Sequence, residues 1–157
     1  MNLDEARTEF TRLRAVESDV SPAELDEIWA ALDTVAAADI LGEWKGDDFA
    51  TGHRLHDALA ATRWYGKTFN SLNDAKPLIC RDEDGNLYSD IKGGNGEASL
   101  WNIEFRGEVT ATMVYDGVSI FDHFKKVDEQ TLMGIMNGKS KLVFDNGQHY
   151  YFLLERV

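Results

Sequence analysis

Gly42-Glu43-Trp44-Lys45-Gly46 is the stretch that decides the fold. It follows a helical pattern and precedes a long region of short, strand-like runs. Tryptophan buries a large apolar ring that carries one N–H to satisfy, and glycine permits a close backbone approach that a Cβ would block. The pentapeptide therefore predicts the first strand of a closed β structure. In that structure Trp44 plugs one end, and Gly42, Trp44 and Gly46 have structural roles.

The composition is that of one compact globular domain. The chain has 157 residues, of which 43% are hydrophobic and 11% are aromatic, and this is enough for a substantial core. Only two prolines are present, and we find no internal repeat, low-complexity segment or domain boundary. We therefore expect a single domain over residues 1–157, with N-terminal helices in 1–40 and a β-barrel in 41–157.

The charge excludes several classes of partner. A net charge of −12 disfavours nucleic acid and anionic lipid surfaces, because binding to either depends on clustered Lys and Arg. The start of the chain lacks the apolar segment of a secretory signal, and no apolar run approaches the ~18–20 residues that span a bilayer. The single Cys80 excludes an internal disulfide. We expect a cytoplasmic, bacterial-type protein without a transmembrane segment.

Two helices are predicted before the pentapeptide. Residues 2–17 carry apolar side chains near helical spacing, with Asn2 as the N-cap. A second helix begins at Ser21, where Pro22 suits the first helical position and Glu24 completes the pattern of a capping box. Its apolar stripe is expected to pack on the rest of the domain.

After Gly42 the pattern is that of short strands separated by turns. The strand-like runs are 41–49, 64–70, 77–82, 86–91, 98–106, 108–115, 118–126, 131–137 and 148–156. A short helix is expected over 53–61, capped by Thr51, and the glycine-rich stretch 93–96 is expected to be a flexible loop or a lid. Asx-Gly pairs such as Asp116-Gly117 are strong hairpin signals, so successive strands should be antiparallel neighbours. Eight or nine such strands predict a lipocalin-like, up-and-down antiparallel β-barrel, mainly β with N-terminal helices.

Longer motifs make the chain similar to a known family. The segment Gly42–Gly46 resembles the GXWXG domain of uncharacterised bacterial proteins. Three further segments resemble the companion domain of unknown function that usually follows it: Phe105–Asp116, Ile120–Asp128 and Leu132–Lys139. The resemblance covers roughly residues 30–156 and implies the fold more than an activity. The chain departs from the family pattern at Ser119, where proline is usual, and at Asn137, where the carboxylate of an aspartate is lost.

A looser resemblance is to the lipocalin and fatty-acid-binding superfamily, whose first strand carries Gly-x-Trp. It implies that Trp44 closes the barrel floor and stacks on an arginine from a late strand, with Arg156 as the partner and Arg106 as its substitute. Nitrobindins share a Gly-x-Trp-x-Gly start, but the continuation Asp47-Asp48-Phe49 differs from theirs and disfavours heme. No cofactor is expected.

No metal or nucleophile motif is complete. His53, His56 and Asp57 share a helix face, but zinc needs one or two more ligands, so no metal site is predicted. The segment 137–140 lacks the spacing of a phosphate-binding loop. Cys80 lies in an apolar run without an evident base, which is typical of a structural thiol, and no catalytic residue is assigned.

Aromatic and polar side chains of the predicted strands are candidates for the wall of a ligand cavity, because such cavities combine aromatic walls with a few polar anchors. Asp122 and Phe124 share one face of their strand and His123 has the other, so Asp122 and His123 do not enter one cavity without a bulge. The predicted ligand-binding residues are Trp64, Tyr65, Phe69, Arg106, Met113, Tyr115, Asp122, Phe124 and Lys126.

Three functions are compatible with this pattern. The first is binding of a small hydrophobic or amphipathic molecule, such as a lipid, with Arg106 gripping an acidic head group. The second is a small barrel enzyme that acts on such a ligand, with Tyr115, Asp122 or His123 as acid or base. The third is a homodimeric interaction module. A buried ionisable group in a cavity favours the enzyme, and an interior filled by aromatic side chains favours the module.

Overall fold

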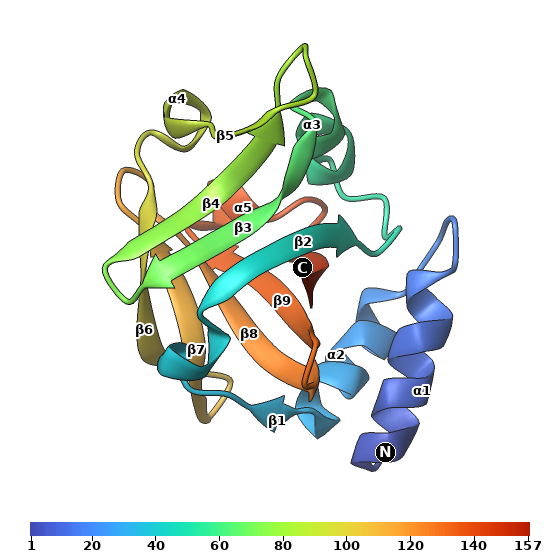
Figure 1. Cartoon of the computed structure of the whole chain (residues 1–157). Helices are drawn as coiled ribbons and strands as arrows, with labels where there is room; N and C mark the ends of the chain where they lie inside the picture. Colours follow the sequence, from blue (N-terminus) through green and yellow to red (C-terminus); the bar gives the residue numbers. More distant parts are fainter.

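The barrel is assembled from consecutive strands that pair as neighbours. The computed structural model describes all residues, 1–157. Eight antiparallel strands follow the order β2-β3-β4-β6-β7-β8-β9-β10, and β10 pairs with β2 to close the ring (Figure 1). With two helices at the N-terminus, this confirms the predicted mainly β, up-and-down architecture.

The element bounds follow the predicted runs closely. The ring strands are β2 (Gly42–Asp48), β3 (Trp64–Ser71), β4 (Asp74–Arg81), β6 (Ala98–Phe105), β7 (Glu108–Tyr115), β8 (Ile120–Asp128), β9 (Thr131–Gly138) and β10 (Tyr150–Arg156). Two short strands pair outside the ring, β1 (Asp33–Thr34) with β8 and β5 (Leu87–Ser89) with β4. The helices are α1 (Leu3–Arg14), α2 (Pro22–Ala31), α3 (Leu55–Ala61), α4 (Ile91–Gly94), α5 (Ser140–Val143) and the 3-10 helix η1 (Ala37–Ile40).

Two hydrophobic cores lie on opposite sides of the strand wall. The inner core fills part of the barrel and includes Trp44, Phe69, Met113, Phe124 and Phe152. The outer core joins α1 and α2 to the outer faces of β8, β9 and β10, and includes Phe10, Leu25, Trp29, Ile135 and Tyr151. Figure 1 shows the two helices beside the ring. This second core explains why several strands are apolar on both faces.

Helix starts follow the sequence signals only in part. Asn2 and Glu5 form a reciprocal capping box at the start of α1. Ser21 lies at the N-cap of α2 without a side-chain capping hydrogen bond, and Glu24 instead pairs with Arg12 of α1 at 3.1 Å. The capping box predicted at Ser21 is therefore wrong, because the glutamate is used to join the two helices.

Three further local predictions differ from the structure. Thr51 does not cap α3, because the helix begins four residues later with Arg54 at the N-cap. The glycine-rich stretch is partly helical, since α4 forms one turn whose start is capped by Asp90 Oδ1, which accepts from Gly93 N–H at 2.9 Å. The single turn of α5 has no counterpart among the predicted helices, because four residues carry too little periodicity to detect.

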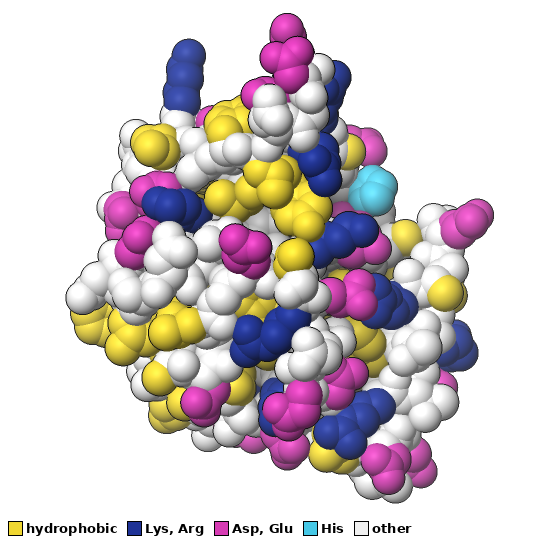
Figure 2. Space-filling view, viewed as in Figure 1, with side chains coloured by type: hydrophobic (Ala, Val, Ile, Leu, Met, Phe, Trp, Pro, Cys, Tyr) yellow, Lys and Arg dark blue, Asp and Glu magenta, His cyan; other side chains and the backbone are white.

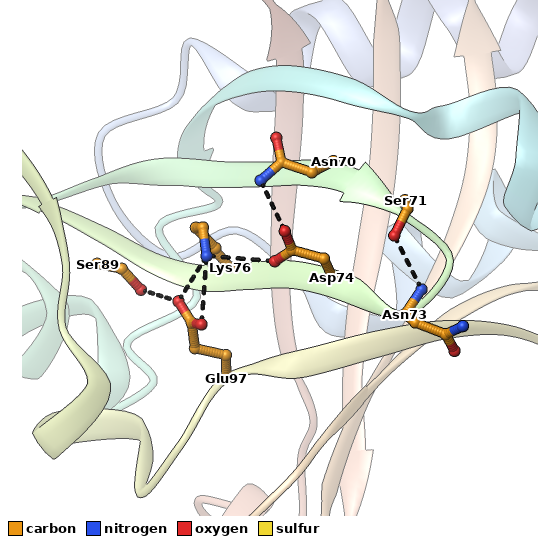
Figure 3. A network of polar contacts seen from close by, with 7 residues as sticks. All are labelled: Asn70, Ser71, Asn73, Asp74, Lys76, Ser89 and Glu97. Carbon is orange, nitrogen blue, oxygen red and sulfur yellow. Dashed lines mark hydrogen bonds and ion pairs between the residues drawn. The ribbon is translucent and has the colours of Figure 1, made fainter.

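The ring is uneven where β4 meets β6. These strands share one ladder pair, Ala75 with Ala98, whereas β6 and β7 share a full ladder. Lys76 of β4 reaches Glu97 at 3.1 Å, and Ser89 Oγ of β5 donates to Glu97 at 2.6 Å (Figure 3). Side-chain contacts thus join the strands where the backbone ladder does not. We call this junction, β4 and β6 with the segment 82–97 between them, the seam.

The surface carries mixed charge. Figure 2 shows acidic and basic side chains interspersed over the visible face, with separate apolar patches among them. Exposed large apolar side chains include Leu87 and Tyr88 of β5 and Trp101 of β6. None of the helices combines the length and the apolar composition that crossing a membrane requires.

Candidate functional site

The pentapeptide at 42–46 closes one end of the barrel. Trp44 is 2% exposed, and the guanidinium carbon of Arg156 lies 4.2 Å from its ring centroid, in the arrangement that the sequence predicted. The two glycines are needed for different reasons. Gly42 has a φ of +128°, a backbone angle that residues with a side chain rarely adopt. A Cβ on Gly46 would lie 2.2 Å from the ring of Trp64. Gly46 therefore makes room for Trp64, which belongs to the other end of the barrel.

A cavity of about 270 Å³ lies at that other end, lined by residues of α3, α4, α5 and the β7–β8 turn. Figure 1 labels these three helices. Twelve of its eighteen lining residues are hydrophobic. The lining residues that carry the argument below are Trp64, Lys67, Tyr115, Asp122, Tyr150 and Phe152. The barrel is therefore filled at the Trp44 end and hollow at the other.

A buried ion pair lies in the wall of the cavity. Lys67 Nζ is 3.1 Å from Asp122 Oδ2, and the two side chains are 4% and 3% exposed. Lys67 Nζ also donates to the carbonyl oxygen of Pro77 at 3.3 Å. Its remaining surroundings are aromatic, with ring centroids at 5.3, 5.5 and 5.8 Å for Phe152, Trp64 and Tyr115. Ring faces attract a cation, so the carboxylate, the carbonyl and the three rings all favour the charged ammonium.

The second carboxylate oxygen of Asp122 has no partner. Oδ1 is buried and makes no hydrogen bond. Burial raises the pKa of the Asp122 carboxyl, and the charge and hydrogen bond of Lys67 oppose that rise. A buried acceptor without a donor costs about 1–3 kcal/mol. Asp122 lines the cavity, and its Oδ1 is a hydrogen-bond acceptor that lacks a donor.

Two tyrosines complete the polar part of the wall. Tyr150 Oη donates to Asp48 Oδ2 at 2.7 Å. Burial raises the phenol pKa of both Tyr115 and Tyr150, and the nearby charges of Asp122 and Asp48 raise these pKa values further. Both hydroxyls therefore stay protonated at neutral pH and act as donors.

A β-bulge brings Trp64 into the cavity beside Lys67. Trp64 and Lys67 are three residues apart, so a regular strand would place them on opposite faces. The pairing of β3 with β4 shifts register on both sides of Gly66, and a bulge of this kind re-aims the side chains that follow it. Lys67 and Phe69 are two residues apart and share the inner face, so alternation from Phe69 already places Lys67 inside, and the bulge adds Trp64 to that face. The glycine in β3 and Pro77 in the facing strand were the available signals, because both residues weaken a regular ladder.

The structure brings together only part of the predicted ligand-binding set. Three of its members line the cavity: Trp64, Tyr115 and Asp122. Three others face the same interior but lie buried in the inner core and do not line the cavity: Phe69, Met113 and Phe124. The buried inner core and the cavity wall are thus separate parts of one barrel interior.

Arg106 is remote from the cavity, which corrects its prediction as an anchor. It lies in the two-residue turn between β6 and β7 and pairs with Asp26 of α2 at 2.7 Å. Tyr115 ends β7 at the cavity, and eight strand residues at about 3.3 Å each place the two positions roughly 25 Å apart. One small ligand cannot contact both.

Lys126 and Tyr65 also lie elsewhere. Lys126 is at the Trp44 end of the barrel, where it lines a separate polar pocket and pairs with Glu129. Tyr65 lies under the guanidinium of Arg81, 4.9 Å from ring centroid to carbon, and does not line the cavity. The structure therefore places both residues outside the cavity that they were predicted to line. Lys126 lies four residues along β8 from Asp122, and the bulge in β3 turns Trp64 inward and Tyr65 outward.

His123 lies on the outer face of β8, opposite Asp122, as strand alternation predicts. Its Nδ1 is 2.8 Å from Thr112 Oγ1, and its Nε2 is 3.0 Å from the Asn137 amide nitrogen. Since the Thr112 hydroxyl donates to a backbone carbonyl, Nδ1–H donates to Thr112 and Nε2 accepts from Asn137. The ring stacks on Phe105 at 4.0 Å. His123 is thus a neutral side chain in the outer wall and has no access to the cavity.

The histidines of the metal-like cluster have different partners. His53 Nε2 is 2.9 Å from the carbonyl oxygen of Val143, whereas His56 Nδ1 is 2.9 Å from the carboxylate of Asp48. The structure holds no group of three or more His, Cys, Asp and Glu side chains arranged to bind a metal ion.

Comparison with known proteins divides the chain into two consecutive matched regions. Residues 27–85 match the family model described as GXWXG protein, and residues 96–156 match the one described as domain of unknown function DUF4334. A crystal structure described as that of a protein from Thermomonospora curvata is 33% identical, with a TM-score of 0.86, over 98% of this chain and 99% of that one. The chain therefore carries a GXWXG domain followed by a DUF4334 domain. No curated protein matches it.

The cavity of this GXWXG protein is shared between the two matched regions. Lys67 comes from the GXWXG region and Asp122 from the DUF4334 region. The segment between the regions, 86–95, contributes Asp90, Gly93 and Gly94 to the mouth. No residue of the GXWXG pentapeptide lines this cavity. Gly46 affects it indirectly, because the missing Cβ leaves room for the ring of Trp64.

Proposed function

We propose that the barrel cavity binds a small, largely apolar molecule. The observation that carries this proposal is a hollow, mostly apolar space with a buried Lys67–Asp122 pair in its wall. Replacing a buried ion pair by apolar side chains is often neutral or stabilising. A buried ion pair beside an apolar cavity is therefore better explained by recognition than by stability.

The size of the cavity limits the ligand. An apolar cavity of about 150 Å³ is enough for benzene, and this one measures about 270 Å³. A molecule with one or two rings, or a short chain, fits such a space, and the full acyl chain of a lipid extends beyond it. Apolar walls supply most of the binding energy, and the few polar groups fix the orientation.

Titration of the protein with 2-naphthol, followed by ¹H–¹⁵N NMR, tests the proposal. We expect saturable shifts concentrated at cavity residues. Ala58→Trp places a large ring at the mouth and should abolish binding, whereas Ala61→Trp on the same helix, outside the lining, should leave it unchanged. Arg106→Ala should also have no effect. Absence of saturation up to about 1 mM, where binding is worth only ~4 kcal/mol, would contradict the proposal.

A second candidate function is acid–base catalysis in the same cavity. It is favoured by one observation, the ionisable Asp122 whose pKa is raised by burial. A carboxylate of this kind is suited to accept a proton from a bound molecule near neutral pH. In this version Asp122 is the base and Tyr115 a donor, and His123 takes no part. Mass spectrometry of ligands after incubation separates the two functions, because binding alone returns every compound unchanged.

A further inference from the structure

The charge balance of the cavity restricts the ligand that it accepts. Lys67 and Asp122 carry opposite charges 3.1 Å apart and are neutral as a unit. A charged ligand of either sign would therefore add an uncompensated charge to a buried site, which is costly. The protein as a whole has a net charge of −12, which further disfavours an anion. The ligand that fits this balance is neutral.

The hydrogen-bond balance restricts the ligand further. Lys67 Nζ contacts the Asp122 carboxylate and the Pro77 carbonyl oxygen, and the nearest aromatic ring centroid is 5.3 Å away. Asp122, in contrast, has Oδ1 buried without any donor. Lys67 thus already has a carboxylate partner, whereas Asp122 lacks a donor for Oδ1. An arriving molecule improves the site when it brings an O–H or N–H and worsens it when it brings a second carboxylate.

We infer that the ligand is a small, neutral, apolar molecule with one hydroxyl group, an alcohol or a phenol, that donates to Asp122 Oδ1. This rests on the proposed function and names its ligand class. The protonated hydroxyl of Tyr115 in the same wall is available to donate to the ligand oxygen. Lys67 then acts as a positioning residue, because it keeps Asp122 ionised and holds Oδ2 so that Oδ1 is the oxygen left for the ligand.

Three naphthalenes of similar shape test the inference at pH 7 by NMR titration. 2-Naphthol offers a neutral donor, 2-methylnaphthalene has the same size without one, and 2-naphthoate is an anion. A hydrogen bond to a charged acceptor predicts that 2-naphthol binds about 10–100-fold more tightly than 2-methylnaphthalene. 2-Naphthoate should bind more weakly than either.

The double variant Lys67→Met/Asp122→Leu is the matched control. It removes both charges together, so the fold is expected to persist. It should bind 2-methylnaphthalene at least as tightly as the natural protein and lose the preference for 2-naphthol. Equal binding of 2-naphthol and 2-methylnaphthalene by the natural protein, or tightest binding of 2-naphthoate, overturns the inference but leaves the cavity as a binding site. Failure of all three compounds to bind overturns the proposed function itself.

Discussion

His123 shows how one residue makes stability depend on pH. Burial, followed by the electrostatic effects of His149 and Arg106, lowers the pKa of its imidazole to about 4. In the unfolded chain the pKa is near 6.5, so as pH falls from about 6.5 to 4 the unfolded state takes up the proton first. Stability therefore decreases over this window, by at most about 3 kcal/mol. The amide of Asn137, which donates to Nε2, favours the neutral ring.

Asn137→Asp should weaken this dependence. A carboxylate in place of the amide accepts from Nε2–H and stabilises the charged imidazolium, so the pKa of His123 should rise. Stability should then fall less between pH 6.5 and 4. Titration of the histidine ring protons by NMR and unfolding midpoints at several pH values measure both effects. Asn73→Asp, in an exposed turn, adds the same charge elsewhere and should leave the His123 titration unchanged. An unaltered His123 titration in Asn137→Asp would falsify the assigned hydrogen bonds.

Strand β2 couples the closed end of the barrel to the cavity, and Gly46 is the point of coupling. A Cβ there would lie 2.2 Å from the Trp64 ring, so Gly46→Ala must displace that ring. We expect a loss of about 1–3 kcal/mol in unfolding free energy, measured by denaturant titration, together with weaker binding of 2-naphthol.

Trp64→Phe provides the control for that expectation. The smaller ring removes the clash, so Gly46→Ala should cost much less in the Trp64→Phe background than in the natural protein. Equal costs in both backgrounds would show that the contact with Trp64 is not the reason for glycine at this position.

At the scale of elements, the sequence predicted the strands and hairpins that follow regular patterns, and it did not predict the β-bulge that interrupts such a pattern. The strand runs and hairpin turns were readable because alternation and Asx-Gly pairs are local signals. Face assignments held along β8, where Asp122 and His123 diverge as alternation requires. They failed along β3, where the bulge at Gly66 puts Trp64 and Lys67 on one face although they are three residues apart. Arg106 was misplaced because local pattern says nothing about which end of the barrel a turn occupies.

For the whole molecule, the seam is the weakest part of the ring. One ladder pair joins β4 to β6, and the Lys76–Glu97 contact is partly exposed, so it contributes at most about 1 kcal/mol. Hydrogen exchange should therefore be faster in segment 88–100 than in β8 and β9.

Lys76→Met should accelerate exchange in segment 88–100 and leave β8 and β9 unchanged, because it removes a contact that spans only the seam. Hydrogen-exchange mass spectrometry measures both regions at once. Lys45→Met, at a lysine of β2 that forms no ion pair, is the control for loss of charge and should leave the exchange of this segment as it is. Uniform exchange around the ring would show that the junction of β4 and β6 is as firmly closed as the others.

The pairing of Lys67 with Asp122 has a consequence for how the two matched regions depend on each other. The lysine lies in the region that matches the GXWXG model and the aspartate in the region that matches DUF4334. A chain with either region exchanged for an unrelated one would bury a lone charge in the barrel, at a cost of about 3–5 kcal/mol. The two regions are therefore not interchangeable modules, because neither of them contains by itself the contact that balances the buried charges.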